Sequence, residues 1–232
     1  MVRLLPGTVV ETRIQDREIR FFVRNPDDHI QSHHLQGIFY EREELAIIAR
    51  YFHEGGVFVD IGTNVGNHSI FIEKFCNPRR IINFEINPEA IGIFTLNRYL
   101  NELKSCDIGF LGVALGQREG RVSLVQPDPD NLGCTAIQPS PEGVLRCLPG
   151  DAVLAARPVD LVKIDVEGTE MDVLAGLART IARWRPALFI EVDDTNEAAF
   201  AEWCDEQAYR RADAFQRYEG KTNFMVLPAE RL

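Results

Sequence analysis

The sequence predicts an α/β fold in which a mostly parallel sheet is covered by helices on both faces. Three observations lead to this prediction: several short runs are apolar almost throughout, segments with helical apolar spacing alternate with them, and each run carries an acid at or near its end. Apolar runs of this length are typical of strands buried on both faces, as in parallel sheets. The runs lie at 57–61, 80–85, 159–165 and 186–192.

An N-terminal extension, residues 1–54, precedes the alternating part of the chain. We expect two short strands at 8–14 and 18–23, a turn at 25–28, and a helix over 41–52 whose acidic first turn suits the helix dipole. The chain of 232 residues is therefore divided into this small β/α extension with a cap helix and a main domain over 55–232.

The main domain alternates strands and helices. A helix begins at Asn87-Pro88, where Asn caps and Pro takes the first helical position. Residues 126–150 carry five prolines and are expected to form a long loop insert, of the kind that often serves as a substrate lid. The other expected elements are strands at 107–115 and 121–125, helices after 168 and over 197–207, and a closing pair of strands at 209–215 and 222–227.

Composition and charge exclude several classes of protein. With 25 basic and 35 acidic side chains the net charge is −10, and the arginines are dispersed, so we expect no nucleic-acid partner. No apolar run approaches the ~20 residues of a membrane span or forms a signal peptide, which leads us to expect a cytoplasmic protein. The five cysteines are widely spaced without a C-x-x-C pair, which argues against a disulfide framework or a zinc site.

The stretch 57–71 is the main functional signal. It reads as a buried strand, a tight turn with Gly62 and Gly66, and a helix start, an arrangement that can present backbone N–H groups to a ligand. A phosphate-binding P-loop is excluded because Asn67-His68 stand where Lys-Ser/Thr would be. A dinucleotide fold prefers G-x-G-x-x-G, but Asn64 occupies the middle position and Asp60 would face the diphosphate.

A ligand with positive charge and no phosphate removes that objection. S-adenosylmethionine carries an ammonium and a sulfonium group, which Asp60 would attract. Glu85, at the end of the next strand, is then placed to accept the ribose hydroxyls. The same acid serves dinucleotide folds, so an NAD-type oxidoreductase stays open, as does a glycine turn that only packs a helix on a strand.

Four motifs resemble the FkbM family of S-adenosylmethionine-dependent methyltransferases over roughly residues 38–228. They are Asp60-Ile61-Gly62-Thr63-Asn64-Val65-Gly66-Asn67-His68, Phe84-Glu85-Ile86-Asn87-Pro88-Glu89-Ala90, Val113-Ala114-Leu115-Gly116, and Val159-Asp160-Leu161-Val162-Lys163-Ile164-Asp165-Val166-Glu167-Gly168-Thr169-Glu170, with a similar strand at 185–192. The resemblance implies a class I methyltransferase (Rossmann-like), doubly wound sheet of seven strands with the last strand antiparallel. It also implies O-methylation of sugar hydroxyls and natural products.

The resemblance assigns cofactor roles to these motifs. The glycine turn would line the methionine end of the cofactor, Glu85 would hold the ribose, and Val113-Ala114 would lie near the adenine. Ile86 departs from the proline that many members have there. The expected cofactor-binding residues are Asp60, Gly62, Thr63, Asn64, Gly66, Glu85, Ile86, Val113, Ala114 and Asp165.

Catalytic candidates sit where strands end. Asp165 and Glu167 would share one side of an extended chain and supply the base, although they could instead be an acid pair that stabilises a helix N-terminus. Lys163 points the same way and could orient Asp165 or bind a substrate oxygen. Glu191 would lie beside them, and three carboxyls could bind Mg²⁺ or Ca²⁺, a divalent metal that the sequence does not favour. His68 is a substrate ligand or a packing histidine.

Two further segments could cover the site. His33-His34 lie in the N-terminal extension, and Asn131-Leu132-Gly133-Cys134-Thr135 lies within the long loop, where a lid and a plain surface excursion are equally compatible. We hypothesise an S-adenosylmethionine-dependent O-methyltransferase acting on a hydroxyl of a sugar, glycoconjugate or natural product. The alternatives are the NAD-type oxidoreductase and a non-catalytic cofactor-binding interaction module. The N-terminal strands could also pair copies into a homo-oligomer.

Overall fold

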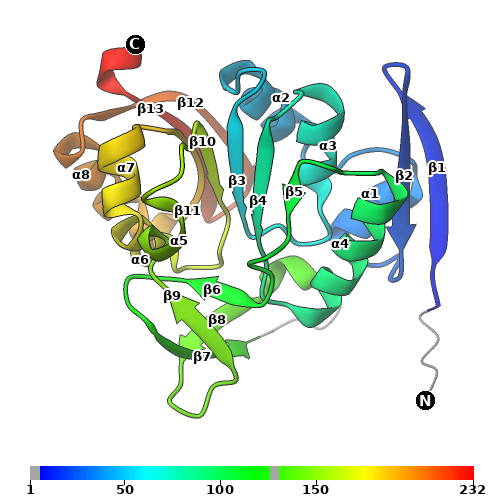
Figure 1. The fold of residues 1–232 in the computed structure, drawn as a ribbon, viewed down its shortest axis with the longest axis horizontal. Coiled ribbons are helices and arrows are strands. Elements are labelled where there is room, and N and C mark those ends of the chain that lie inside the picture. The colour runs from blue at the N-terminus through cyan, green and yellow to red at the C-terminus, as the bar shows by residue number, and fades with distance from the viewer. Residues whose placement is uncertain (1–5, 126–130) are drawn as a thin grey trace.

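The computed structural model describes residues 6–125 and 131–232 and is built on a seven-stranded mixed sheet (Figure 1). The order across the sheet is β12-β13-β11-β10-β3-β4-β5, and the last strand in the chain, β13, is antiparallel to both neighbours. The strands are β3 (Val57–Ile61), β4 (Arg80–Phe84), β5 (Cys106–Asp107), β10 (Leu161–Ile164), β11 (Ala187–Asp193), β12 (Tyr209–Tyr218) and β13 (Lys221–Pro228). The predicted α/β sheet with an antiparallel last strand is therefore observed.

Helices cover both faces of this sheet, as continuous apolar strands require. One face packs against α5 (Asp151–Leu154), α6 (Glu170–Gly176), α7 (Ala178–Trp184) and α8 (Glu197–Glu206). The other packs against α2 (Arg42–Tyr51), α3 (Asn67–Phe75) and α4 (Pro88–Leu100). The alternation of residues explains the split, because Val57 and Val59 lie in the first cluster while Phe58 between them lies in the second.

The N-terminal hairpin, β1 (Thr8–Ile14) and β2 (Arg17–Val23), lies beside α4 (Figure 1). Two buried amides, one on α4 and one at its C-cap, hold it: Asn97 Oδ1 accepts the Phe22 N–H at 2.7 Å, and Asn101 Oδ1 accepts the Arg20 N–H at 2.9 Å. Side chains of β2 and α2 join the same hydrophobic cluster as the central sheet. The extension predicted over 1–54 is thus packed against the main domain; pairing of copies through its strands stays a prediction.

The strand predicted at 107–115 is wrong in part, because only its two ends are strands and they belong to different sheets. Only Cys106–Asp107 joins the central sheet, and the chain then turns through Gly112, which has a φ of +84° and donates its N–H to the Glu85 carbonyl at 2.7 Å. Val113–Leu115 (β6) belongs instead to a second, four-stranded sheet. Glycine conformations outside the extended region break a strand that the apolar pattern alone would continue.

The loop predicted over 126–150 is wrong in part, because it holds two strands of this small sheet. The small sheet consists of β6, β7 (Gly120–Val125), β8 (Ala136–Pro139) and β9 (Leu145–Leu148), in the order β6-β9-β7-β8. Pro139 is tolerated because it ends β8, which is an edge strand. Residues 126–130 of the prediction lie outside the described residues. The small sheet sits below the carboxyl ends of the central strands in Figure 1.

Helix α1 (His29–Leu35) was not expected from the sequence, where its start was interpreted only as a turn. Asp28 caps it by accepting the Ile30 and Gln31 N–H groups, and its other oxygen accepts the Leu132 N–H at 3.0 Å. One buried carboxylate therefore ties α1 to the short helix η1 (Leu132–Cys134). None of the helices in the described ranges has the length and apolar composition that a membrane span needs.

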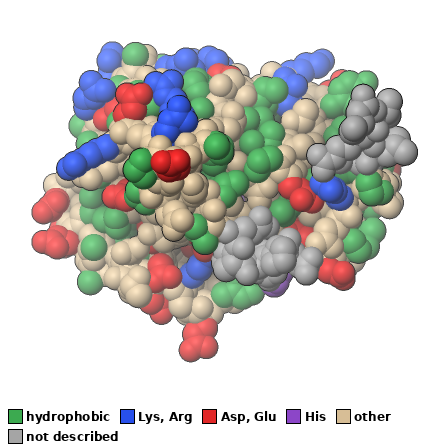
Figure 2. All heavy atoms as spheres, turned by 90° about the horizontal axis from the view of Figure 1, so that it is seen from below, with side chains coloured by type: hydrophobic (Ala, Val, Ile, Leu, Met, Phe, Trp, Pro, Cys, Tyr) green, Lys and Arg blue, Asp and Glu red, His purple; other side chains and the backbone are tan. Residues whose placement is uncertain are grey.

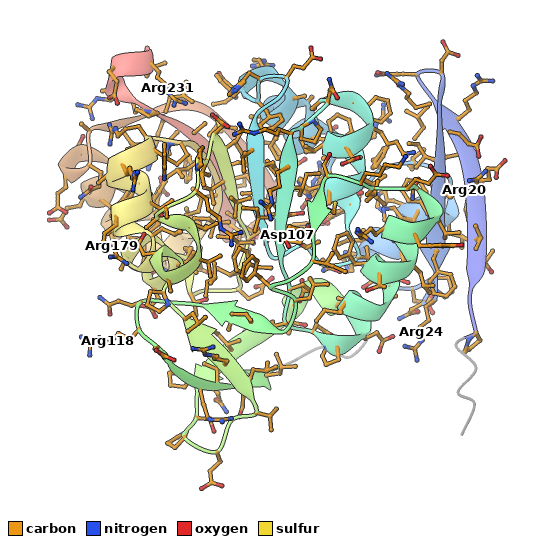
Figure 3. All side chains as sticks on the ribbon, viewed as in Figure 1. Arg20, Arg24, Asp107, Arg118, Arg179 and Arg231 are labelled. Atoms are coloured by element: carbon orange, nitrogen blue, oxygen red, sulfur yellow. The ribbon has the colours of Figure 1, made fainter. Side chains whose placement is uncertain are left out.

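Charged side chains are spread over the surface. In Figure 3 the labelled Arg118 and Arg179 lie at the left, Arg20 and Arg24 at the right, and Arg231 near the C-terminus. On the face that carries the small sheet, acidic, basic and apolar side chains are interspersed (Figure 2). This agrees with the dispersed arginines of the sequence, and the absence of a nucleic-acid partner stays a prediction.

Candidate active site

A cavity of about 340 Å³ opens at the carboxyl edge of β3, β4, β10 and β11. This is the edge where ligands of open α/β sheets bind, and the volume lies within the range of small-molecule sites. Elements from far along the chain close the cavity: α1, the loop before α2, the segment 131–137 and the β12–β13 turn.

The glycine turn lines the cavity through Gly62, Thr63 and Asn64, but it does not offer its N–H groups to a ligand. The N–H groups of Gly62 and Thr63 donate to the Phe84 carbonyl, and that of Asn64 donates to Glu85. The N–H groups of residues 65 and 66 also have acceptors within the turn. The expectation of free backbone donors is therefore wrong, and the turn is poorly suited to phosphate.

The two glycines of the turn are required by close packing. A Cβ at Gly62 would lie 1.9 Å from the Asp165 carbonyl oxygen, and one at Gly66 would lie 2.4 Å from the Phe94 ring. Both residues have positive φ, +83° and +91°. Gly62 lines the cavity, whereas Gly66 packs the start of α3 against α4 and is not in the cavity wall.

Glu85 is fixed with its carboxylate at the cavity wall. Its oxygens accept the N–H groups of Asn64 at 2.6 Å, Ile86 at 2.7 Å and Asn87 at 2.8 Å. A carboxylate has about four acceptor directions, so these bonds leave capacity for a hydroxyl donor from a ligand. Burial raises the pKa of Glu85, which the three N–H groups oppose.

An apolar wall lies next to Glu85. Ile86, Val113 and Ala114, which the sequence assigned to the cofactor, all line the cavity there, together with Leu132 and Ile137. Flat apolar surface beside a hydroxyl-accepting carboxylate suits a nucleoside, whose base is apolar on its faces and whose ribose carries hydroxyls.

Asp60 does not line the cavity, contrary to the direct contact that the sequence suggested. Its side chain is fully buried, accepts the Ser69 hydroxyl at 2.6 Å, and lies 3.7 Å from Lys163 Nζ. The register explains this, because Lys163 on β10 is the direct partner of Asp60 on β3. Asp60 therefore acts on the cavity through Lys163.

The buried Lys163 and the half-buried Asp165 form an ion pair at the end of β10, 2.9 Å apart. Lys163 also donates to the Gly62 carbonyl at 2.8 Å, which joins the pair to the glycine turn. Burial lowers the pKa of Lys163, but Asp165 and Asp60 outweigh it and raise the pKa above its usual value. Burial raises the pKa of Asp165, and Lys163 outweighs it, so the net direction is down. Asp165 is thus held ionised and is a weak base.

Glu167 and Glu191 are brought together by Lys221, which the sequence did not single out. Lys221 Nζ lies 2.5 Å from Glu167 and 3.0 Å from Glu191, and all three side chains line the cavity. Burial and the nearby Asp165 raise the pKa of Glu191 to about 7 despite Lys221. An ammonium group occupies the space between carboxylates where a metal was considered, and the described residues hold no cluster of three or more metal-ligating side chains.

Glu41 is a second residue that the sequence interpretation missed, since it was assigned only to the acidic first turn of a helix. It precedes α2 with φ +56° and ψ +46°, a left-handed conformation that costs a non-glycine residue about 1–3 kcal/mol. Its side chain makes no capping bond and lines the cavity, where an oxygen lies 3.7 Å from His68 Nε2. Burial, with Asp165 next, raises the pKa of Glu41 well above its usual value.

His68 also lines the cavity, from the first turn of α3. Its ring is buried, Nε2 has no hydrogen-bond partner among the described residues, and burial lowers its pKa to about 3. The neutral ring therefore faces Glu41 without a positive charge. His34, by contrast, stacks on Phe21 with ring centroids 4.0 Å apart and is a core residue; α1 supplies His29 and Ile30 to the cavity instead.

Comparison with known proteins agrees with this geometry. Residues 60–213, about two thirds of the chain, match the model of the methyltransferase FkbM domain. The hexuronic acid methyltransferase AglP of Haloferax volcanii is 26% identical over 167 residues, which are 70% of this chain and 65% of the relative. The matched region thus spans just under two thirds of that relative's length.

Solved structures share the fold at low sequence identity. M. jannaschii TYW2 in complex with AdoMet has a TM-score of 0.53 at 14% identity, covering 97% of this chain and 87% of its own. A putative methyltransferase from Streptococcus mutans in complex with SAH has a TM-score of 0.51 at 10% identity, covering 80% and 95%. The central sheet is thus of the kind found in class I methyltransferases.

Proposed function

We propose, because the chain belongs to the FkbM methyltransferase family, that it transfers a methyl group to a hydroxyl of a sugar, glycoconjugate or natural product. The chain is an S-adenosylmethionine-dependent methyltransferase by its family, and the family match decides against the oxidoreductase. The methyl-transfer assay below separates the enzyme from a non-catalytic cofactor-binding module. What the proposal adds is the acceptor and the residues that act on it.

The residues of the cavity fit S-adenosylmethionine. Glu85 retains acceptor capacity for a ribose hydroxyl, and the wall at Ile86, Val113 and Ala114 suits adenine. Six carboxylates line the cavity against two ammonium groups, which favours a ligand with positive charges and disfavours the diphosphate of a dinucleotide. Asp60 lies outside the cavity wall and contributes through its ion pair with Lys163.

The bound cofactor supplies a methyl group on a positively charged sulfur. The protein holds the acceptor oxygen in line with that methyl group and removes the hydroxyl proton. We assign the orientation of the glycine turn and Asp165 to Lys163, which contacts both. We assign binding of acceptor hydroxyls to Glu167, Glu191 and Lys221, which together offer carboxylate acceptors and an ammonium donor.

The observation that supports a hydroxylated acceptor is this polar wall of Glu167, Glu191 and Lys221. It lines the same cavity as Glu85 and the apolar wall beside it, where we place the nucleoside. A sugar ring presents several hydroxyls that both donate and accept, so it can bond to such a mixed wall. The name of the relative from Haloferax volcanii, a hexuronic acid methyltransferase, points to the same substrate class.

The test is methyl transfer from radiolabelled S-adenosylmethionine to a panel of monosaccharides, glycosides and glycan fractions. The product is then mapped to the methylated oxygen by NMR. Methylation of a carbon or nitrogen, or transfer only to acceptors that lack sugar-like hydroxyls, would refute the proposal. Lys221→Met is expected to raise the KM for the acceptor, while calorimetry should find the affinity for S-adenosylmethionine unchanged.

A further inference from the structure

The acid that takes the proton from the acceptor is the open question of the site. Of the six carboxylates that line the cavity, Glu85 is held by backbone N–H groups and Glu219 lies exposed on the β12–β13 turn, which leaves four candidates: Glu41, Asp165, Glu167 and Glu191. A general base must reach the acceptor proton and must be free to receive it. Their partners separate the four candidates.

Three of these carboxylates already hold an ammonium group. Asp165 is paired with Lys163 at 2.9 Å, and Lys221 lies 2.5 Å from Glu167 and 3.0 Å from Glu191. Each such contact places an ammonium group against the carboxylate and stabilises its ionised form. Glu191 is the main competitor of Glu41, because burial and Asp165 raise its pKa to about 7, but Lys221 occupies its carboxylate. Among the described residues, the one ion-pair partner within 4 Å of Glu41 is the His68 ring, at 3.7 Å.

The backbone directs Glu41 to this place. Asn67, the first residue of α3, accepts the Tyr40 N–H at 3.1 Å and donates to the Tyr40 carbonyl at 2.9 Å. This clamp fixes the peptide before Glu41, and the left-handed conformation of Glu41 then turns its side chain to the cavity. His68 follows Asn67 on the same helix, so one helix start positions both residues. Strain of this kind, at a buried ionisable group, is typical of functional sites.

We propose that the Glu41 carboxylate is the base that accepts the acceptor proton. This rests on the proposed function. The acceptor O–H bond breaks and its proton passes to Glu41, while the oxygen forms a bond to the methyl carbon. The methyl–sulfur bond breaks with its electron pair on sulfur, which becomes a neutral thioether.

The surroundings of Glu41 suit this role. Burial and the neighbouring acids raise its pKa above the usual range of a glutamate, which makes it a stronger base than an exposed carboxylate. The charged and titratable groups that face it come from several elements: Glu44 on α2, His68 on α3, Lys163 and Asp165 at β10, and Glu191 on β11, with the Tyr40 hydroxyl beside it.

The test compares Glu41→Gln with Glu43→Gln, a control on the same helix turn whose exposed carboxylate bonds to Arg217 outside the cavity. For Glu41→Gln we expect unchanged S-adenosylmethionine binding by calorimetry and a loss of turnover of about 100-fold or more. The acidic limb of the wild-type pH–rate profile should also disappear. Turnover within about threefold of wild type, or loss of cofactor binding together with turnover, would overturn the proposal.

A second measurement needs no acceptor. Because the folded pKa of Glu41 is raised, its stabilising effect is present below the unfolded value of 4.5 and is lost as the pH rises through the folded pKa. The Tm of Glu41→Gln minus the Tm of wild type should therefore increase as the pH rises. Glu43→Gln should show the opposite trend, because the Arg217 bond lowers the pKa of Glu43. No gain for Glu41→Gln overturns the assignment of Glu41. Wild type that binds the cofactor but methylates no hydroxyl overturns the proposed function instead.

Discussion

Replacing Lys163 with methionine should expose how much the buried Asp60 depends on its neighbour. Asp60 is fully buried and lies 3.7 Å from Lys163 Nζ, with Ser69 as its other partner. At an effective dielectric constant of ~20 a pair at this distance interacts with about 4 kcal/mol. In the variant Asp60 can instead take up a proton, which at pH 7 costs about 4 kcal/mol for an acid of the usual value of 3.8 and less for Asp60, because burial already raises its pKa. The predicted loss in unfolding free energy is therefore at most about 4 kcal/mol.

The assay is urea unfolding of Lys163→Met, Asp60→Asn and the double variant. The double variant should recover about 2 kcal/mol or more of the loss, because Asp60 no longer contributes a buried unpaired charge, while the unpairing of Asp165 is common to both Lys163 variants. The pH dependence has a definite sign: a protonated Asp60 in the variant has a folded pKa above its unfolded value, so the deficit should shrink as the pH falls toward 4. A loss under about 1 kcal/mol, or strict additivity of the two changes, would refute the reasoning.

Three further predictions concern the cavity. Glu85→Ala should weaken S-adenosylmethionine binding about 10- to 100-fold, as loss of a hydrogen bond to a charged group predicts, and calorimetry on the folded variant that finds unchanged affinity would exclude Glu85 from the ribose site. His68 should stay neutral from pH 5 to 8, since its pKa is lowered to about 3; an imidazole NMR signal that titrates near the usual value would contradict its buried place. Neutral sugars should be methylated faster than hexuronates, because Glu41, Glu167 and Glu191 face a bound acceptor and would repel its carboxylate. Competition assays that rank uronates first would show instead that attraction to the lysines outweighs this repulsion.

The acids of the site have different partners, and these partners suit them to different roles. Asp60 and Asp165 share Lys163 and hold the turn, Glu85 is held by backbone N–H groups, and Glu167 and Glu191 share Lys221. Each of these has a strong hydrogen-bond or ion-pair donor in direct contact, whereas the titratable ring nearest to Glu41, His68, is neutral. A proton acceptor and a binding group need opposite surroundings, and the cavity supplies both.

Much of this arrangement was encoded locally and could be predicted. Apolar strands that end in acids placed Glu85, Asp165 and Glu191 at one edge, since parallel strands share their carboxyl ends. The turn at Gly62 was recognisable because its spacing is a local backbone requirement. The segment 107–115 misled the prediction because apolar content resembles a strand even where glycines turn the chain.

The tertiary structure alone decided which acids are free and which are paired. The register of β10 against β3 put Lys163 opposite Asp60 and drew that acid out of the cavity. The antiparallel return of β13 brought Lys221 between Glu167 and Glu191. The left-handed conformation of Glu41 before α2 directs its side chain into the cavity, although a glutamate at a helix start usually faces solvent. The sequence by itself determined the sheet, the glycine turn and the family, because these follow from local patterns. Pairing across distant strands depends on register and backbone conformation, which no local pattern specifies.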